Sequence, residues 1–234
     1  MRSIMKKVLF TLVLFPLFVY AATGVPVKLE SVKINIKDEA ALLRGAKFFA
    51  TNCMSCHTLK YLAHNKLAKR AGITLDKMPL KNKKWWLGVV PPDLTLTALQ
   101  RGPAWLYTYL HAFYKDAKRP TGYNNLLVPN SVMMNVMAGM QGQQVLSPQG
   151  KYALAHLKTA KPLRYYTLLR LEKSGSMMPE QYDQSITDLV NFLAYASEPA
   201  KLHRIHLGWW VLLFLAVLFI LAWLLKKAYW QDIK

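Results

Sequence analysis

Apolar residues gather in two runs, one close to each end of the chain. The first run covers residues 8–20 and follows a short start that contains three basic residues. A basic start, a mostly apolar run of 13 residues and the small pair Ala21-Ala22 are together typical of a secretory signal peptide. The run is also short for a helix that must cross about 30 Å of hydrocarbon. We therefore predict a signal peptide over 1–21, with an uncleaved N-terminal anchor as the alternative.

The second run covers residues 207–225, where only Gly208 among 19 residues is not strongly apolar. As a helix, at about 1.5 Å per residue, this run reaches roughly 28 Å, which is enough to span a bilayer once. Tryptophans near both of its ends, and Lys226 directly after it, are typical of a membrane interface. We predict a transmembrane helix over 205–226, and the signal peptide implies that residues 227–234 form a cytoplasmic tail.

Residues 22–204 carry helical patterns separated by turn-forming residues, which predicts one exported domain. Helices are predicted over 38–50, where Asp38 can act as the N-cap, and over 103–114, where the proline can occupy the first turn. A third helix is predicted over 180–196, with its apolar residues at helical spacing. The second helix has an aromatic stripe on one face, made of Trp105, Tyr109 and Phe113.

The segments between these helices are less regular. Asp93 follows two prolines and can cap a short helix that runs towards Arg101. Residues 118–150 are rich in Asn, Gly, Gln and Pro, which predicts a long loop of low regularity. Residues 165–171 have the pattern of a strand.

Composition and charge narrow the possible partners. The chain has 234 residues, 53% of them hydrophobic, and a formal net charge of +19. The hydrophobic share excludes an intrinsically disordered chain, because disorder needs low hydrophobicity. Residues 22–204 hold 25 Lys and Arg against 11 Asp and Glu, so most of the basic charge belongs to the exported domain. Export excludes nucleic acid as a natural partner, whereas anionic lipid headgroups can attract part of this charge.

The two cysteines of the chain stand in the sequence Cys53-Met54-Ser55-Cys56-His57. In an exported chain, a cysteine pair can form a disulfide or serve as a thiol redox pair. The redox motif belongs to a βαβ context, whereas the residues before Cys53 have a helical pattern. The histidine directly after Cys56 completes C-x-x-C-H, the attachment signature of a c-type haem. We predict one covalently bound haem c, attached through Cys53 and Cys56, with His57 as an iron ligand.

The residues alone leave several candidates for the second axial ligand. Methionine is a common choice in electron-transfer haems and raises the potential. Small soluble c-type cytochromes often place this ligand shortly before their last helix, which favours Met177 or Met178. Met133 and Met134, in the central loop, are equally available. Histidines are further alternatives, namely His64, His111, His156, His203 and His206. Spacing does not choose among them.

Ordered motifs along the chain resemble those of the cytochrome c1 family, the haem subunits of the cytochrome bc1 complex (ubiquinol–cytochrome c reductase), of the bacterial kind. The resemblance runs from about Leu29 to the C-terminus. C-x-x-C-H by itself would suit any c-type cytochrome, whereas an ordered set of motifs before one C-terminal span is characteristic of this family. Besides C-x-x-C-H, the set comprises residues 91–95 (PPDLT), 101–102 (RG), 105–110 (WLYTYL), 119–125 (RPTGYNN), 141–144 (QGQQ), 179–183 (PEQYD), 189–193 (LVNFL) and 198–199 (EP).

The resemblance implies a mainly α fold: a class I cytochrome c-like core with long loop insertions, plus one C-terminal transmembrane helix. It also implies an axial methionine in the central loop after a Pro-Asn pair, which indicates Met133. The family's ligand is normally followed by proline, whereas Met134 follows here, so Met134 remains the alternative. By the same resemblance, Arg101 approaches a haem propionate, whose negative charge a cation stabilises, and Pro92 packs against the ring.

The resemblance further implies electron transfer within a quinol-oxidising complex. An electron from quinol reaches the Rieske iron–sulfur protein, then this haem, then a soluble or membrane-bound cytochrome c. Partners are therefore the cytochrome b subunit, the Rieske protein and the acceptor, in a homodimeric complex of the bacterial inner membrane with the haem domain on the periplasmic side. The alternatives are a membrane-anchored monohaem carrier outside such a complex and an exported thiol oxidoreductase.

The basic charge gives a separate expectation about the acceptor. Members of the family commonly offer an acidic surface to a basic cytochrome c, whereas this chain has few acidic residues to offer. We therefore expect an acidic acceptor domain, met by basic residues around the haem edge.

Overall fold

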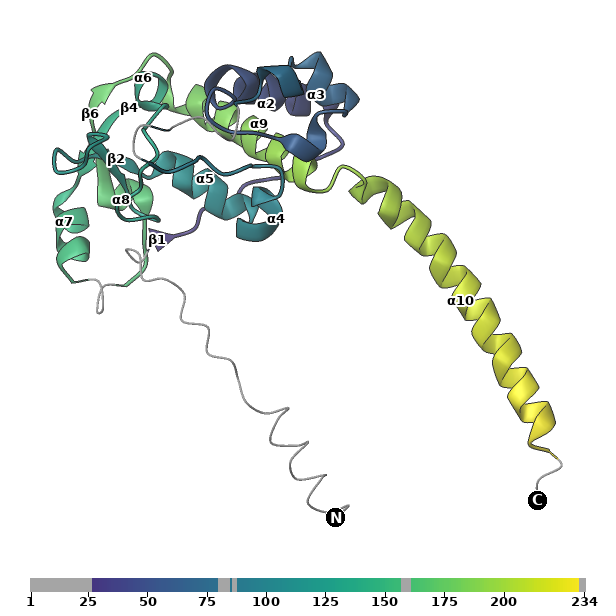
Figure 1. The fold of residues 1–234 in the computed structure, drawn as a ribbon. Helices are drawn as coiled ribbons and strands as arrows, with labels where there is room; N and C mark the ends of the chain where they lie inside the picture. The colour runs from purple at the N-terminus through teal and green to yellow at the C-terminus, as the bar shows by residue number, and fades with distance from the viewer. Residues whose placement is uncertain (1–26, 80–84, 86–87, 157–160, 232–234) are drawn as a thin grey trace.

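The computed structural model describes residues 27–79, 85, 88–156 and 161–231. The predicted signal peptide lies outside these residues. Figure 1 shows a globular part built largely of helices, from which one long helix projects. The predicted fold class, mainly α with one apolar helix at the C-terminal end, is confirmed.

The helices and strands of the described residues are short, apart from three longer helices. The α-helices are α2 (Glu39–Asn52), α3 (Lys66–Arg70), α4 (Thr97–Arg101), α5 (Pro103–His111), α6 (Ala138–Gln141), α7 (Pro148–Ala155), α8 (Tyr165–Leu168), α9 (Pro179–Ser197) and α10 (Lys201–Tyr229). The 3-10 helices are η1 (Lys60–Leu62) and η2 (Leu75–Lys77). The strands are β1 (Val27–Lys28), β2 (Phe113–Lys115), β3 (Tyr123–Asn125), β4 (Gly142–Leu146), β5 (Leu163–Arg164) and β6 (Leu169–Ser174).

The core of the domain forms where α2 crosses α9. The carboxylate of Asp38 caps α2 by accepting a hydrogen bond from the N–H of Ala41, as the sequence predicted. The apolar face of α2 packs on α9, and the rings of Phe49 and Phe192 lie 6.2 Å apart, centroid to centroid. Both phenylalanines are fully buried. Burial of this kind stabilises a helix pair by about 1.5–3 kcal/mol for each large side chain.

Gly45 allows the two helices to approach this closely. A Cβ at this position would lie 2.0 Å from the carbonyl oxygen of Asp188 and 2.9 Å from the Cβ of Phe192. Beside this contact, Arg44 forms an ion pair with the buried Asp188 at 2.6 Å. The crossing therefore sets the position of α2, and with it the position of the residues that follow α2.

Three predicted segments differ from the structure because strands pair within them. The helix predicted over 103–114 ends at His111, since the next residues pair in β2 with β3 as an antiparallel hairpin. The predicted loop over 118–150 contains β3, α6 and β4. The predicted strand over 165–171 begins instead as the short helix α8 and becomes a strand only in β6, which pairs with β4. These pairings are long-range contacts, which local patterns do not report.

The helix that starts near Asp93 is also different from the prediction. It begins at Thr97 with Leu96 as the N-cap, and no side chain caps it. The carboxylate of Asp93 instead accepts hydrogen bonds from Thr58 Oγ1, the Lys60 N–H and the Thr95 N–H. Asp93 therefore joins two distant segments of the chain rather than starting a helix.

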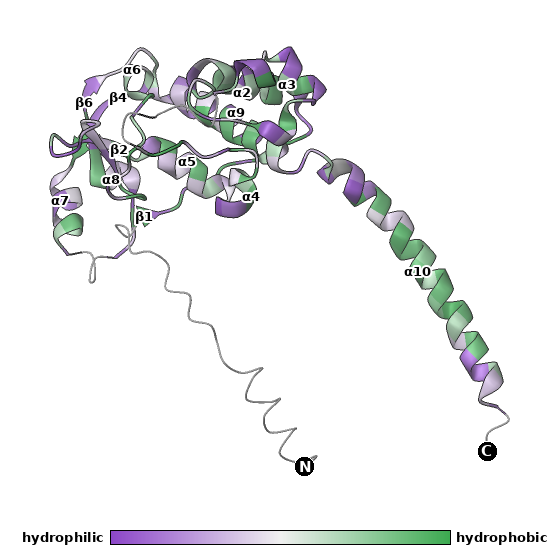
Figure 2. Ribbon diagram, in the orientation of Figure 1, coloured by the Kyte–Doolittle hydropathy of each residue, from purple (hydrophilic) through white to green (hydrophobic). Residues whose placement is uncertain are grey.

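The C-terminal helix α10 extends beyond the apolar run on both sides. Residues His203–Tyr229 form a candidate membrane span by length and composition, and none of this span is buried within the protein. Figure 2 shows hydrophobic residues along the middle of α10 and hydrophilic residues towards its ends. Near the C-terminal end, the ammonium of Lys227 lies 5.7 Å from the ring centroid of Trp223. An apolar surface of this length needs hydrocarbon around it, which supports a membrane anchor.

We predict that Gly45→Ala destabilises the domain by about 1–3 kcal/mol, the usual cost of overpacking a core. The atoms in the way belong to the backbone of Asp188 and cannot rotate aside. Thermal or urea unfolding of the full-length protein in detergent measures this loss. Gly139→Ala is the matched control, because no atom lies within 4 Å of a Cβ there, and it should unfold as the parent does. Equal stability of the two variants would contradict the close crossing.

Candidate functional site

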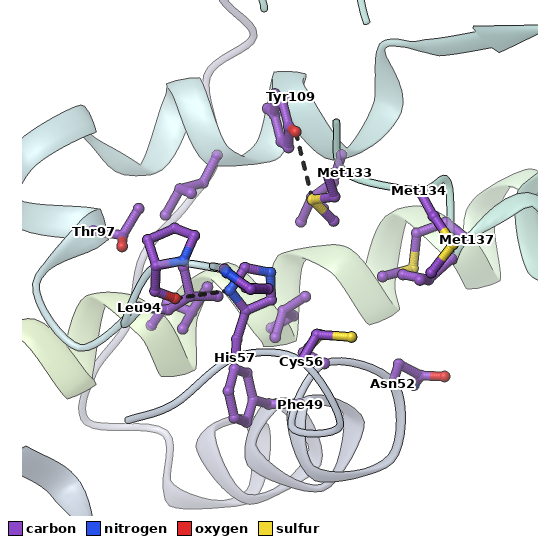
Figure 3. A pocket seen from close by; sticks show the side chains of 18 of the residues that line it. Phe49, Asn52, Cys56, His57, Leu94, Thr97, Tyr109, Met133, Met134 and Met137 are labelled. Carbon is purple, nitrogen blue, oxygen red and sulfur yellow. Dashed lines mark hydrogen bonds between the residues drawn. The ribbon is translucent and has the colours of Figure 1, made fainter. Parts of the chain in front are cut away.

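An apolar pocket of about 350 Å³ lies between α2, α5 and α9. Its walls come from segments far apart in the chain: the end of α2 with the residues after it, the 91–94 segment, α4 and α5, residues 132–137, and α9. Figure 3 shows side chains from these elements directed towards one space. The pocket contains all six residues that the sequence predicted to hold or contact a haem, namely Cys53, Cys56, His57, Pro92, Arg101 and Met133.

The two cysteines stand directly after the C-terminal end of α2. Cys53 is the C-cap residue, and the N–H groups of Cys56 and His57 both donate to its carbonyl oxygen, at 3.1 and 2.9 Å. This tight turn presents the cysteines and the histidine to the pocket together. Burial, and secondly the neighbouring Cys56, raise the pKa of the Cys53 thiol to about 12.

These surroundings do not suit thiol redox chemistry. A reactive cysteine needs a lowered pKa, which proteins obtain at helix N-termini or beside cations. Cys53 lies at a helix C-terminus, where the partial charge is negative and disfavours a thiolate. Both cysteines are free and not joined in a disulfide. The site therefore fits covalent attachment of a cofactor better than dithiol exchange.

His57 is oriented by a backbone carbonyl. Its Nδ1–H donates to the carbonyl oxygen of Pro92 at 2.8 Å, which leaves Nε2 without its proton. Burial lowers the pKa of His57, although the Pro92 carbonyl and the nearby Asp93 act in the opposite direction. A neutral imidazole whose Nδ1–H is held by a carbonyl is the usual state of a metal-ligating histidine. The role of Pro92 as an acceptor adds to the ring contact that the sequence predicted.

Asp93 holds the segments that carry His57 and Pro92 together. Thr58 Oγ1 donates to its carboxylate at 2.5 Å and the Lys60 N–H at 3.0 Å. Burial alone would raise the pKa of Asp93, but the hydrogen bonds from Thr58, Thr95 and Lys60 outweigh it, and the pKa lies below its ordinary value. Asp93 is therefore ionised at neutral pH and accepts all of these hydrogen bonds.

Three methionines line the same pocket as His57. Figure 3 shows Met133 below Tyr109, whose hydroxyl donates to the Met133 sulfur at 3.4 Å. Met134 also lines the pocket, with 42% of its surface exposed. Met137 is fully buried and also lines the pocket. It was not among the ligand candidates predicted from the sequence.

The other predicted ligand candidates lie elsewhere. Neither Met177 nor Met178 lines the pocket, and Met178 is 67% exposed. His111 is buried away from the pocket and pairs with Asp183 at 2.9 Å. None of the remaining four histidines, all in the described part of the chain, lines the pocket: His64, His156, His203 and His206.

Arg101 lies at the edge of the pocket, at the end of α4. Its guanidinium carbon is 5.1 Å from the ring centroid of Trp105, which lines the pocket as well. Stacking of this kind holds the exposed cation beside the apolar wall. A cation at this position can pair with an acidic group of a bound cofactor.

The donor set and the walls fit a haem c. The pocket offers two thiols, a neutral imidazole and a thioether, which are the groups that bind this cofactor and its iron. The walls are apolar, as a porphyrin ring requires, and a cation lies at the edge. The sequence marks Pro92 and Asp93 by the turn that they form with the preceding proline. Nothing in the sequence placed Met137 at this site or the Tyr109 hydroxyl beside the Met133 sulfur.

Comparison with known proteins agrees with this geometry. The Cytochrome C1 family matches residues 68–233. The chain is 39% identical to cytochrome c1 of Allochromatium vinosum, over 97% of this chain and 99% of the relative. It is 36% identical to a protein named ammonia monooxygenase gamma subunit of Nitrosomonas europaea, over 98% of this chain and 99% of that one. Cytochrome c1 of Rhodospirillum rubrum is 26% identical over 84% of this chain and 83% of its own length. The chain therefore belongs to the cytochrome c1 family, and this membership implies a haem c cofactor and a role in electron transport.

Proposed function

We propose that this chain is the haem subunit of a quinol–cytochrome c oxidoreductase, which accepts electrons from the Rieske iron–sulfur protein and passes them to a cytochrome c. The observation that carries the proposal is the convergence of Cys53, Cys56, His57 and Met133 on one apolar pocket of a membrane-anchored chain. Family membership supports the same role. The subunit breaks no bond itself, and its contribution is to hold the redox group and set its potential.

Each of the six pocket residues that the sequence predicted to hold or contact a haem has a role in this proposal. Cys53 and Cys56 would hold the haem through their thiols, and His57 and Met133 would bind its iron. The haem, when bound, supplies one-electron chemistry at its iron. Arg101 stabilises the charge of a propionate, and Pro92 both packs on the ring and orients His57 through its carbonyl oxygen.

The placement in the cell follows from the predicted signal peptide and the observed apolar helix. We infer that α10 anchors the chain in the bacterial inner membrane, with the haem domain on the periplasmic side. The partners in this location are the cytochrome b subunit, the Rieske protein and the acceptor, and the complex is a homodimer. Burial of α10 in lipid accounts for a long apolar helix that is not buried within the protein.

A second candidate function rests on one of the relatives. The Nitrosomonas europaea protein carries the name of a monooxygenase subunit and aligns over nearly the whole chain. A membrane-anchored monohaem carrier that works outside a quinol oxidoreductase would need the same pocket and the same anchor. The two functions differ in the proteins that surround the chain rather than in its own residues.

Purification through a tag on this chain tests the proposed function. We expect cytochrome b and the Rieske protein to co-purify from detergent-solubilised membranes in stoichiometric amounts, with quinol–cytochrome c reductase activity. Isolation with a haem but without these two subunits would favour the monohaem carrier, and co-purification of monooxygenase subunits would favour the role named for the relative. A haem-free preparation with a titratable dithiol would contradict both.

We predict that Met133→Leu removes the near-infrared charge-transfer band of the ferric protein, because leucine has no lone pair to bind iron. Covalently attached haem should remain, since Cys53 and Cys56 are unchanged, and the reduction potential should fall because methionine ligation raises it. Optical spectra and a redox titration of the tagged complex measure these changes. Met134→Leu is the matched control and should keep the band. Loss of the band in Met134→Leu, with retention in Met133→Leu, would assign the ligand to Met134.

The charge of the domain leads us to propose an acidic acceptor. Most acidic side chains of the described residues are engaged within the protein and leave little negative charge for a partner. Five form ion pairs with Lys or Arg, namely Glu30, Glu39, Glu172, Asp188 and Glu198, while Asp38, Asp93 and Asp116 accept hydrogen bonds in caps and turns. Residues 22–204 hold 25 Lys and Arg against 11 Asp and Glu, so these ion pairs leave an excess of basic side chains on the domain.

We predict that the complex reduces an acidic cytochrome c faster than a basic one at low ionic strength. The advantage should shrink as salt rises, because about 0.1 M salt screens charges beyond roughly 10 Å. Stopped-flow rates with both acceptors across a salt series measure this effect. A faster reaction with the basic cytochrome at low salt would contradict the acidic acceptor and leave the proposed electron transfer standing.

A further inference from the structure

The sulfur of Met133 has a hydrogen-bond donor beside it. Tyr109 extends from α5 towards the loop that carries Met133, and its hydroxyl oxygen lies 3.4 Å from the sulfur (Figure 3). A thioether sulfur has no proton, so the tyrosine hydroxyl must be the donor in this contact. The same hydroxyl oxygen lies 3.2 Å from Ser131 Oγ.

The protons of this small network can be assigned by counting donors. Ser131 Oγ accepts a hydrogen bond from the Met133 N–H at 3.2 Å, so its own proton is free to point elsewhere. Tyr109 Oη has one proton and gives it to the Met133 sulfur. The Ser131 hydroxyl can then donate to Tyr109 Oη, and every group in the chain Ser131–Tyr109–Met133 has a partner.

The ring of Tyr109 is held on both sides. It stacks on Trp105 with ring centroids 4.9 Å apart and planes 9° from parallel. It meets Phe113 edge to face, at 5.1 Å and 70°. The donor is thus fixed in position by the rings on either side of it.

We propose that Tyr109 is a positioning residue for Met133, and that its hydrogen bond to the sulfur raises the reduction potential of the haem. The inference rests on the proposed function, in which Met133 is an iron ligand. It adds a residue that neither C-x-x-C-H nor the ligand set contains, and it gives Tyr109 of α5 a function besides core packing.

The direction of the effect follows from the lone pairs of sulfur. A thioether has two, so one can bind iron while the other accepts the hydrogen bond. The donor withdraws electron density from the sulfur and makes it a weaker ligand towards the ferric ion, which has the greater need of electron density. The ferrous form is then relatively favoured. Hydrogen bonds to ligands tune metal sites in this manner.

The test is Tyr109→Phe in the tagged complex, with the potential measured by redox titration. Phenylalanine keeps the ring and its stacking on Trp105 and removes only the hydroxyl. We expect the ratio of ferrous to ferric haem at a fixed ambient potential to fall by up to about tenfold. For a one-electron couple, this corresponds to a reduction potential lower by up to about 59 mV. The near-infrared band should persist with a changed energy, because Met133 stays bound through its other lone pair.

Tyr107→Phe is the matched control. It makes the same change on the same helix, but Tyr107 does not line the pocket and its ring lies 4.2 Å from that of His111. This variant should keep the parent's potential and band energy. A merely structural role for the hydroxyl of Tyr109 would alter stability and leave the potential unchanged.

The outcomes separate this inference from the proposed function. An unchanged potential in Tyr109→Phe, or an equal fall in both tyrosine variants, would overturn the inference and leave Met133 as the ligand. Retention of the near-infrared band in Met133→Leu would overturn the ligand assignment and the inference with it. A fall confined to Tyr109→Phe, with the band retained, supports both.

Discussion

The close crossing of α2 and α9 is the contact on which the site depends. Gly45 brings α2 against the backbone of Asp188, and the end of α2 determines where Cys53 begins its turn. The same α9 supplies Leu189 and Leu193 to the pocket wall. One helix contact therefore positions both the turn from Cys53 to His57 and the part of the pocket wall that α9 supplies. A shift of α2 would move the two cysteines relative to the rest of the pocket.

The second constraint is a set of polar contacts between the residues that follow Cys56 and the segment that contains Pro92 and Asp93. His57 Nδ1–H is bound by the Pro92 carbonyl, and the carboxylate of Asp93 accepts from Thr58 and from the Lys60 N–H. These contacts join residues more than 30 positions apart. They leave Nε2 of His57 as the ring atom available to a metal, which is a preorganised state rather than one that forms on binding.

The acidic side chains of the described residues lie apart from the apolar pocket. The pocket is apolar, with Arg101 at its edge, whereas the acidic side chains are used in ion pairs, caps and turns. A neutral interior favours retention of a porphyrin and a defined potential, and a basic exterior favours encounter with an anionic partner.

The sequence by itself determined the elements whose signal is local. The C-x-x-C-H motif predicts haem attachment, the 19-residue run over 207–225 with Gly208 as its one residue that is not strongly apolar predicts a membrane helix, and the Asp38 cap starts α2 where the pattern predicted it. The tertiary structure alone decided which methionines reach the pocket, excluding Met177 and Met178, and placed the Tyr109 hydroxyl on the Met133 sulfur. The reason is physical: caps, motifs and hydrophobic runs act between near neighbours in the chain, whereas the residues that share the pocket with His57 are selected by how separate segments pack.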